Sequence, residues 1–295
     1  MRTESNPTIE RVVATRDRLG ETPLWCIRTE KLWWIDIELP KIQSYEPGTG
    51  CHDILPIEGT YLGSLALTGN AHHLVGIDLG LFQVDPTTGV TAPFAAIETG
   101  LDNRLNDGRV DGNGRLWIGT MDNQLHRANG SLYRVDPDGS VNRMLGGIIV
   151  TNGIAHAPDN RTLYLTDTRR FCTWAFDLDR SDGTISNRRL FADYRDSGDR
   201  PDGACVDVDG CLWTAFFAGS RVVRYRPDGT IDRTIQLPVT NPTCVCFGGR
   251  ELKTLYITTA CKFLTDEQLG SESLAGCLLA IDGIGQGVPE NRFGI

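Results

Sequence analysis

The chain lacks long apolar runs, clusters of basic residues and long amphipathic helical patterns. No stretch approaches the roughly 18 apolar residues of a membrane-spanning helix, and the first residues contain no apolar segment of the kind found in secretory signals. We therefore expect a cytoplasmic protein with no membrane partner. The net charge of −9 and the missing basic patch also argue against nucleic acid as a partner, and they favour cations as ligands.

Cysteine and histidine are present, but not in the patterns of a disulfide framework or a zinc site. The cysteines number nine, which is odd, and the closest pair, Cys244 and Cys246, falls within one expected strand and points to opposite faces. We expect reduced, mostly buried thiols. The five histidines show no ligand spacing, which disfavours zinc relative to an ion with oxygen ligands. His126 falls in a segment, 122–129, that could cover a cavity, but an ordinary exposed loop residue is the preferred interpretation.

A short strand motif with a leading leucine recurs six times along the chain. The copies are LWWID at 32–36, LVGID at 74–78, LWIGT at 116–120, LYLTD at 163–167, LWTAF at 212–216 and LYITT at 255–259. Successive copies begin 42, 42, 47, 49 and 43 residues apart. A repeat of about 40 to 50 residues without helical periodicity is typical of a β-propeller with one four-stranded blade per repeat. The sequence therefore predicts an all-β fold, a six-bladed β-propeller that occupies residues 1–295 as a single domain.

Turn signals separate the strands of each repeat. Each motif follows a turn rich in Gly, Asp, Asn or charged residues, such as 111–115, and a second turn such as 135–139 comes after it. The segment 8–13 alternates like a strand but precedes the first complete repeat. We expect it to pair with the C-terminal blade and close the ring, because an unpaired edge strand invites aggregation.

The residues that open the innermost strands occupy equivalent positions, 10 to 12 residues before each motif. They are Glu21, Ser64, Asn106, Asn152, Asp202 and Thr243. Because the inner strands of a propeller line one channel, these residues should meet around a common axis. Four of the six carry carboxylate or amide oxygens, which are the ligands that hard divalent cations prefer. A divalent ion would also relieve the repulsion between two carboxylates in a poorly hydrated channel.

Turn chemistry offers an alternative explanation for these polar residues. Asn-Gly and Asp-Gly are common turn dipeptides, and for any single position a turn would be the better interpretation. Turns need not keep a constant distance to the following strand, however. The shared register in four repeats therefore favours a cation site.

Several strings around these positions are similar to those of a known family. They are LGETPLW at 19–25, NRLNDG at 103–108, GTM at 119–121, TNG at 151–153, PDG at 201–203 with LW at 212–213, and CFGG at 246–249. Through them, over nearly its whole length, the chain resembles the family of gluconolactonase, regucalcin (senescence marker protein) and luciferin-regenerating enzyme, whose fold is a six-bladed propeller.

The resemblance implies roles for five residues. It implies that Glu21, Asn152 and Asp202 bind one divalent metal ion and that Asp202 also handles the proton of the reaction. It implies further that Arg104 and Asn106 contact the substrate. The metal roles of Glu21 and Asp202 agree with the register of the repeats.

The resemblance also implies an activity, the hydrolysis of a sugar-acid lactone to the free acid. A glucono-, xylono- or arabinono-type lactone or a modified sugar lactone would serve as substrate, and the metal is left open between Ca²⁺, Mg²⁺, Mn²⁺, Fe²⁺ and Zn²⁺. Family members use an acidic substrate contact shortly after the GTM string, and Gln124 occupies that place here, which predicts a substrate contact by Gln124 or a changed preference. Two alternatives stay open: a phosphotriester or fluorophosphate hydrolase, and a non-catalytic calcium-binding propeller.

Overall fold

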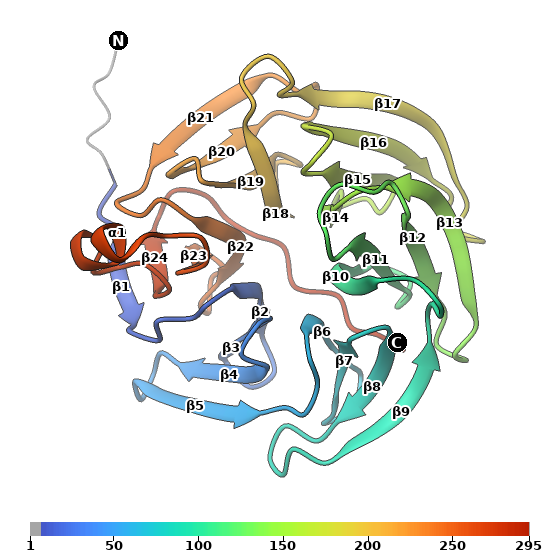
Figure 1. Ribbon diagram of the computed structural model, residues 1–295, viewed down its shortest axis with the longest axis horizontal. Coiled ribbons are helices and arrows are strands. Elements are labelled where there is room, and N and C mark those ends of the chain that lie inside the picture. Colours follow the sequence, from blue (N-terminus) through green and yellow to red (C-terminus); the bar gives the residue numbers. More distant parts are fainter. Residues whose placement is uncertain (1–6, 295) are drawn as a thin grey trace.

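The computed structural model describes residues 7–294 and arranges them as six four-stranded antiparallel sheets in a ring (Figure 1). Within these residues it contains 24 strands and one short helix. Five of the sheets run in sequence order from the innermost to the outermost strand. The prediction of an all-β, six-bladed propeller is confirmed.

The blades follow one another along the chain. The first contains β2 (Gly20–Cys26), β3 (Lys31–Asp36), β4 (Lys41–Glu46) and β5 (Cys51–Pro56), and the second contains β6 (Leu62–Leu67), β7 (His73–Ile77), β8 (Gly80–Val84) and β9 (Thr91–Ala96). The third contains β10 (Asn103–Val110), β11 (Leu116–Asp122), β12 (Gly130–Val135) and β13 (Val141–Ile148), and the fourth contains β14 (Thr151–His156), β15 (Thr162–Asp167), β16 (Cys172–Leu178) and β17 (Ile185–Asp193). The fifth contains β18 (Arg200–Val206), β19 (Leu212–Phe217), β20 (Arg221–Tyr225) and β21 (Ile231–Gln236).

The sixth blade combines the two ends of the chain. It contains β22 (Pro242–Gly248), β23 (Thr254–Thr259) and β24 (Leu278–Asp282), and the N-terminal strand β1 (Glu10–Val13) pairs with β24 as its outer strand. The connection from β23 to β24 carries the helix α1 (Asp266–Ser271), whose first turn is capped by Thr265 and Gln268 in a capping box. No helix within residues 7–294 could span a membrane.

The recurrent motifs form the second strand of each blade, where they are buried between neighbouring sheets. Three of the motifs contain a fully buried tryptophan whose indole N–H donates to a buried aspartate. The pairs are Trp34 with Asp17 at 3.0 Å, Trp117 with Asp111 at 3.0 Å and Trp213 with Asp207 at 2.8 Å. These bonds satisfy the polar end of each aromatic ring in the core.

The aspartate that ends some motifs fixes the loop leading to the innermost strand. The carboxylate of Asp36 accepts the backbone N–H groups of residues 18 and 19, immediately before β2, at 2.9 and 3.2 Å. The carboxylate of Asp167 accepts those of residues 149 and 150, immediately before β14, at 2.9 and 3.2 Å. The motif thus positions the beginning of the inner strand, where the polar residues of the shared register lie.

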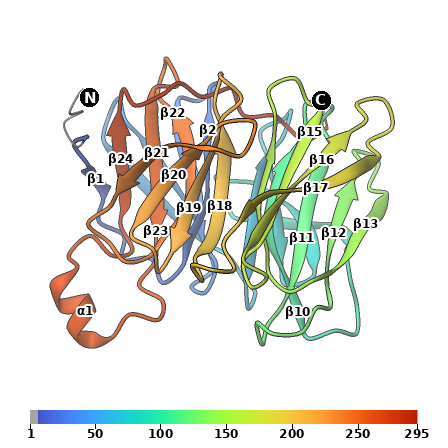
Figure 2. The same ribbon diagram turned by 90° about the horizontal axis from the view of Figure 1, so that it is seen from above.

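Residues 286–294 form a strap across the channel (Figure 1). The backbone N–H of Val208, in the fifth blade, donates to the carbonyl of Gln286 at 3.0 Å. The backbone N–H of Phe293 donates to the carbonyl of Leu67, in the second blade, at 2.8 Å. Figure 2 places α1 and this C-terminal strap at opposite ends of the propeller. The strap therefore closes one end of the channel, and the α1 end is left for access.

Candidate functional site

The six residues of the shared register all lie near the beginning of the innermost strands. Glu21 lies in β2, Ser64 in β6, Asn106 in β10, Asn152 in β14, Asp202 in β18 and Thr243 in β22. All six are buried, with at most 6% of any of them exposed. Polar side chains at such depth need polar partners or a ligand.

In all six innermost strands the pairing with the second strand shifts at this level. The shifts fall between Glu21 and Leu24, Leu62 and Ser64, Leu105 and Gly108, Asn152 and Ala155, Pro201 and Ala204, and Pro242 and Cys244. Such bulges bend a strand locally and re-aim its side chains, and they often occur beside functional sites. Here they form a complete ring around the end of the channel.

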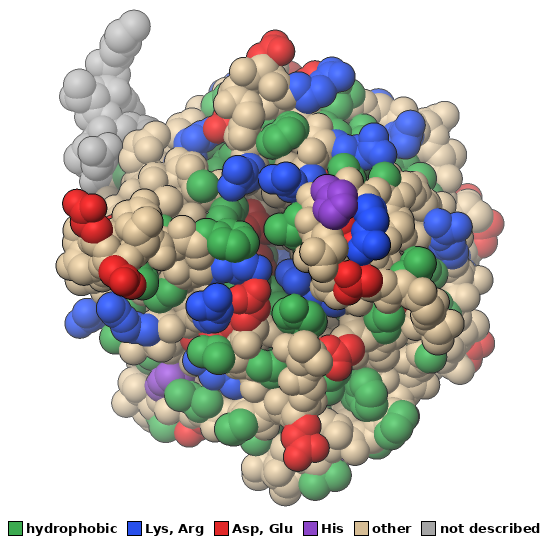
Figure 3. Space-filling view, viewed as in Figure 1, with side chains coloured by type: hydrophobic (Ala, Val, Ile, Leu, Met, Phe, Trp, Pro, Cys, Tyr) green, Lys and Arg blue, Asp and Glu red, His purple; other side chains and the backbone are tan. Residues whose placement is uncertain are grey.

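One cavity of about 310 Å³ joins five of the predicted site residues: Glu21, Arg104, Asn106, Asn152 and Asp202. They come from four different blades. Figure 3 shows the corresponding hollow near the centre of the ring, with acidic side chains at its bottom and basic side chains around it. Ser64 and Thr243 do not line the cavity.

A hydrogen-bond network fixes the two amide side chains. The Nδ2 of Asn106 donates to the Oδ1 of Asn152 at 2.8 Å and to the carbonyl of Thr151 at 2.9 Å. The Nδ2 of Asn152 donates to the hydroxyl of Thr168 at 2.9 Å, and this hydroxyl donates to the carbonyl of Pro201 at 2.6 Å. Because an amide oxygen has two lone pairs, the Oδ1 of Asn152 can still bind a second partner.

Three carboxyl groups share this buried region. Burial, with a smaller contribution from the charge of Asp107, raises the pKa of Glu21 to about 8. Burial also raises the pKa of Asp202 well above its usual range, and the charges of Glu21 and Asp107 raise it further. The pKa of Asp107 is raised by burial as well. Negative charge is therefore unfavourable here unless a cation compensates it.

Asp107 is a member of this cluster that the sequence analysis did not select. Its Oδ2 accepts the backbone N–H of Ile154 at 2.7 Å. In a regular strand neighbouring side chains point to opposite faces, so a channel-facing Asn106 would turn Asp107 away from the site. The bulge between Leu105 and Gly108 removes that alternation.

Four basic side chains line the same cavity: Arg104, Arg169, Arg200 and Lys262. Arg104 is only 5% exposed, and burial lowers the pKa of its guanidinium. Its guanidinium carbon lies 4.7 Å from the centre of the Tyr61 ring, a cation–π contact. The ammonium of Lys262 pairs with Glu38, which also accepts the Nε of Arg18 at 2.8 Å.

Gln124, predicted to contact the substrate, does not line the cavity. Its Nε2 donates to the carboxylate of Asp102 at 3.1 Å, while the Oδ2 of Asp122 accepts the backbone N–H of His126 at 3.0 Å and folds the loop back. Leu125 of this loop faces the cavity instead. The side chain of His126 is 67% exposed, as expected for an ordinary loop residue.

The remaining metal-binding residue types form no competing centre. Within residues 7–294, no group of three or more His, Cys, Asp and Glu side chains is arranged to hold a metal ion. The predicted ligand set differs from such a group because Asn152 supplies an amide oxygen beside the carboxylates of Glu21 and Asp202. All nine cysteines are free and seven of them are buried, in agreement with the expected reduced thiols.

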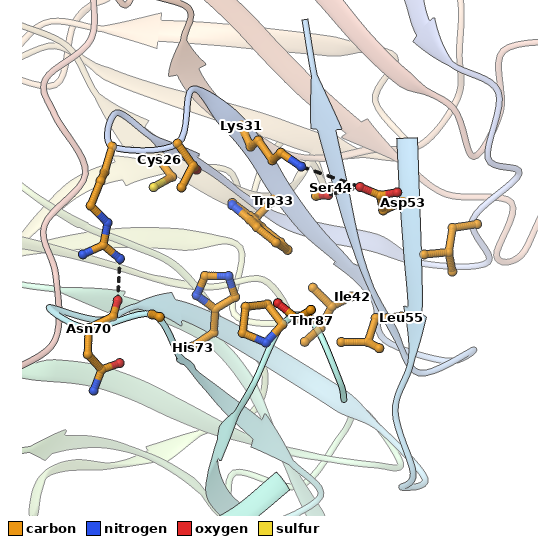
Figure 4. A pocket seen from close by; sticks show the side chains of 15 residues that line it. Cys26, Lys31, Trp33, Ile42, Ser44, Asp53, Leu55, Asn70, His73 and Thr87 are labelled. Carbon is orange, nitrogen blue, oxygen red and sulfur yellow. Dashed lines mark hydrogen bonds and ion pairs between the residues drawn. The ribbon is translucent and has the colours of Figure 1, made fainter. Parts of the chain in front are cut away.

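A larger cavity of about 910 Å³ lies between the first two blades (Figure 4). Trp33 and His73 meet there edge to face with ring centres 4.5 Å apart, and the ammonium of Lys31 lies 3.6 Å from the Oδ2 of Asp53. None of the predicted site residues lines this cavity, and Asp53 is its single carboxylate. It therefore offers no oxygen cluster for a cation, and we place the functional site in the smaller cavity.

Comparison with known proteins agrees with this fold. A family model described as SMP-30/Gluconolactonase/LRE-like region matches residues 19–261. The chain is 38% identical to a 6-deoxy-6-sulfogluconolactonase of Pseudomonas putida, over 93% of this chain and 94% of that protein, and 33% identical to a pentonolactonase of Haloferax volcanii, over 97% and 98%. A crystal structure of a calcium-binding protein, regucalcin, from Agrobacterium tumefaciens superposes with a TM-score of 0.94 at 27% identity, covering 98% of each chain.

Proposed function

The chain belongs to the SMP-30/gluconolactonase/LRE-like family, and on that basis we propose that it hydrolyses the lactone of a sugar acid to the free acid with one divalent metal ion. The observation that carries this proposal is the convergence of Glu21, Asn152 and Asp202 from three blades on one buried cavity. The relatives named above as lactonases act on different sugars, so the shared part of the proposal is the lactone chemistry.

The residues of the cavity fit a hard divalent cation. Glu21 and Asp202 supply two carboxylates, whose pKa values are raised by burial and by neighbouring carboxyl groups, and Asn152 supplies an oriented amide oxygen. Oxygen donors of this kind suit Ca²⁺, Mg²⁺ or Mn²⁺ better than zinc. A bound divalent cation supplies Lewis acidity toward a carbonyl oxygen and lowers the pKa of a nearby water.

Asp202 is the group that moves the proton in this proposal. Beside a cation its carboxylate is ionised, because an opposite charge lowers a carboxyl pKa. As general base it takes a proton from the water that attacks the lactone carbonyl carbon. It then returns this proton to the ring oxygen as the acyl carbon–oxygen bond breaks, so that water is added across the bond and a hydroxy acid forms.

Arg104 and Asn106 hold the substrate. Both line the cavity from β10, two residues apart: Arg104 pairs with Met121 just before the bulge, and Asn106 lies within the bulge. Arg104 contributes a fixed cation with donors still free, since its Nε has no hydrogen-bond partner among the described residues. Fixed donors orient the lactone toward Asp202 and reduce the entropy cost of reaching the reactive geometry.

Metal removal tests this proposal. The purified protein is stripped with a chelator, reconstituted separately with Ca²⁺, Mg²⁺ and Mn²⁺, and assayed by acid release on aldonolactones and, in parallel, on phosphotriesters. We expect lactone turnover that is lost on stripping and restored by a divalent ion. Full activity of the stripped protein, or stronger turnover of the phosphorus esters, contradicts the proposal.

A further inference from the structure

The charge around the cavity has the opposite sign to the charge of the whole chain. The protein carries a net charge of −9, yet the cavity is lined by four basic residues, Arg104, Arg169, Arg200 and Lys262, and by two acidic ones, Glu21 and Asp202. The two acidic residues are assigned to the cation in the proposed function. The basic groups are then in excess, and the open end of the cavity should attract anions.

Arg104 is the strongest indication of an anionic ligand. Only 5% of this residue is exposed. No carboxylate within residues 7–294 forms an ion pair with it. Its Nε is buried without a hydrogen-bond partner. A buried guanidinium without a carboxylate partner carries a large desolvation cost, which a bound anion would offset.

Arg169 and Arg200 extend this positive region to the exposed rim. The Nε of Arg169 donates to the carbonyl of Leu125 at 3.1 Å, and neither arginine forms an ion pair in the described part of the chain. By contrast, Arg170, the next residue in the chain, lies 3.2 Å from the carboxylate of Asp167 and is outside the cavity lining. The guanidinium groups at the rim are therefore available to a ligand.

The carboxylate of Glu38 is already neutralised. Glu38 pairs with both Lys262 and Arg18, so two cations share one anion. Burial lowers the pKa of Lys262, the contact with Glu38 raises it, and the charges of Arg104 and Arg18 lower it. A further negative charge from a ligand would be favourable at this place.

We propose, on the basis of the lactonase function above, that the substrate carries a negatively charged substituent away from its lactone group, a sulfonate or a phosphate, which Arg104, Arg169 and Arg200 bind. Guanidinium groups present paired donors that match the oxygens of such anions. The cavity volume of about 310 Å³ suits a monosaccharide derivative rather than an oligosaccharide. In this proposal the three arginines determine the specificity for the charged sugar, and the residues deeper in the cavity carry out the hydrolysis.

Matched substrates test the proposal on the metal-loaded protein. Glucono-1,5-lactone is compared with 6-phosphogluconolactone and 6-deoxy-6-sulfogluconolactone, with correction for spontaneous hydrolysis. We expect kcat/KM to favour at least one charged lactone by about tenfold or more, and this preference to shrink at high salt. The better of the two charged lactones identifies the substituent. Equal kcat/KM for the neutral and both charged lactones overturns the proposal.

Two variants and one control assign the effect to residues. Arg169→Gln and Arg200→Gln should each lower kcat/KM for the charged lactone by about tenfold, mainly through KM, and much less for the neutral lactone. Arg170→Gln, an adjacent arginine outside the cavity lining, should leave every substrate unaffected. Equal losses of kcat/KM on charged and neutral lactones in Arg169→Gln and Arg200→Gln would show that these arginines do not recognise the charged substituent.

A binding measurement separates this proposal from the proposed function. If none of the lactones is turned over, the lactonase proposal fails, and calorimetry then compares 6-deoxy-6-sulfogluconate and 6-phosphogluconate with gluconate, which lacks the second charge. Tighter binding of the two acids that carry a sulfonate or phosphate, weakened in Arg200→Gln, supports the anion site. Equal binding of all three acids overturns it.

Discussion

The Nε of Arg109 lies 3.3 Å from the Oε1 of Glu290, and this ion pair joins the inner strand β10 to the C-terminal strap. Both side chains are nearly buried, 10% and 14% exposed. Arg109 follows Asp107 by two residues and its charge acts on that carboxyl, so Glu290 of the strap supplies the counter-charge of a guanidinium close to the carboxyl cluster.

Glu290→Gln should destabilise the protein by about 3 kcal/mol, because it leaves the buried guanidinium of Arg109 without its counter-charge. Urea unfolding measures the difference. Glu251→Gln is the matched control, since Glu251 pairs with Lys253 at 2.8 Å on the exposed surface and should change stability far less. Equal effects of the two variants would show that the strap pair is not structural.

Asp202→Asn should lower lactone kcat by about 100-fold or more, because the amide cannot take a proton from water. The fold should be retained, since the change removes one of several mutually repelling buried carboxyls. Calcium or magnesium should raise the thermal midpoint of the unmodified protein and fail to do so in the variant. Asp196→Asn, an exposed position outside the cavity lining, serves as control. Wild-type kcat in Asp202→Asn would exclude it as the base.

His156 should make the protein sensitive to acid. Its ring is buried without a hydrogen-bond partner, and burial lowers its pKa from 6.5 to about 4. The unfolded chain therefore binds a proton that the folded chain rejects, so stability is complete above pH 6.5 and falls by up to about 3 kcal/mol as the pH drops through 4.

His156→Gln should show a shallower loss of stability between pH 6.5 and 4 than the unmodified protein. The free energy of unfolding from urea titrations at several pH values measures this slope. His126→Gln is the control, because its side chain is 67% exposed, and its slope should match that of the unmodified protein. Parallel curves for all three proteins would contradict the assignment.

Gly153→Ala should disturb the site as well as the fold. Gly153 has a φ of 54°, and an added Cβ would lie 2.6 Å from the Oγ1 of Thr166. Gly198 has a similar φ of 68°, but no atom lies near an added Cβ. Gly198→Ala therefore measures the destabilisation caused by the positive φ alone, about 1 kcal/mol. Gly153→Ala should cost more in urea unfolding and also weaken metal binding, because Asn152 precedes it. Equal costs would show that the contact with Thr166 relaxes freely.

The repeat of the sequence was sufficient to predict the fold and to select four residues that line one cavity. Motif spacing fixed the number of blades, and counting back from each motif placed Glu21, Asn106, Asn152 and Asp202 at one end of the channel. This worked because strand pairing has a period of two residues and the turns before the motifs are short, so equivalent positions in the sequence become equivalent positions in space.

The remaining parts of the site depend on contacts that no repeat encodes. Bulges set which neighbours of Asn106 join the carboxyl cluster, and they leave no distinct signature in the sequence. Gln124 was placed in the site by its distance from the GTM string, but its loop is folded by Asp122 and directs it to Asp102. Arg169 lies in the connection between β15 and β16, where sequence position does not determine spatial position, whereas Arg200 is the first residue of β18, two residues before Asp202.

The pairing of β1 with β24 also constrains how the protein can be made. Glu10 lies opposite Ala280, so the contact that completes the sixth blade joins the two extremes of the described chain. During synthesis the N-terminal strand has no partner until the last blade leaves the ribosome, and such long-range closure is slow. Nascent chains halted before β24 would expose two strand edges at once, which makes them natural clients for chaperones.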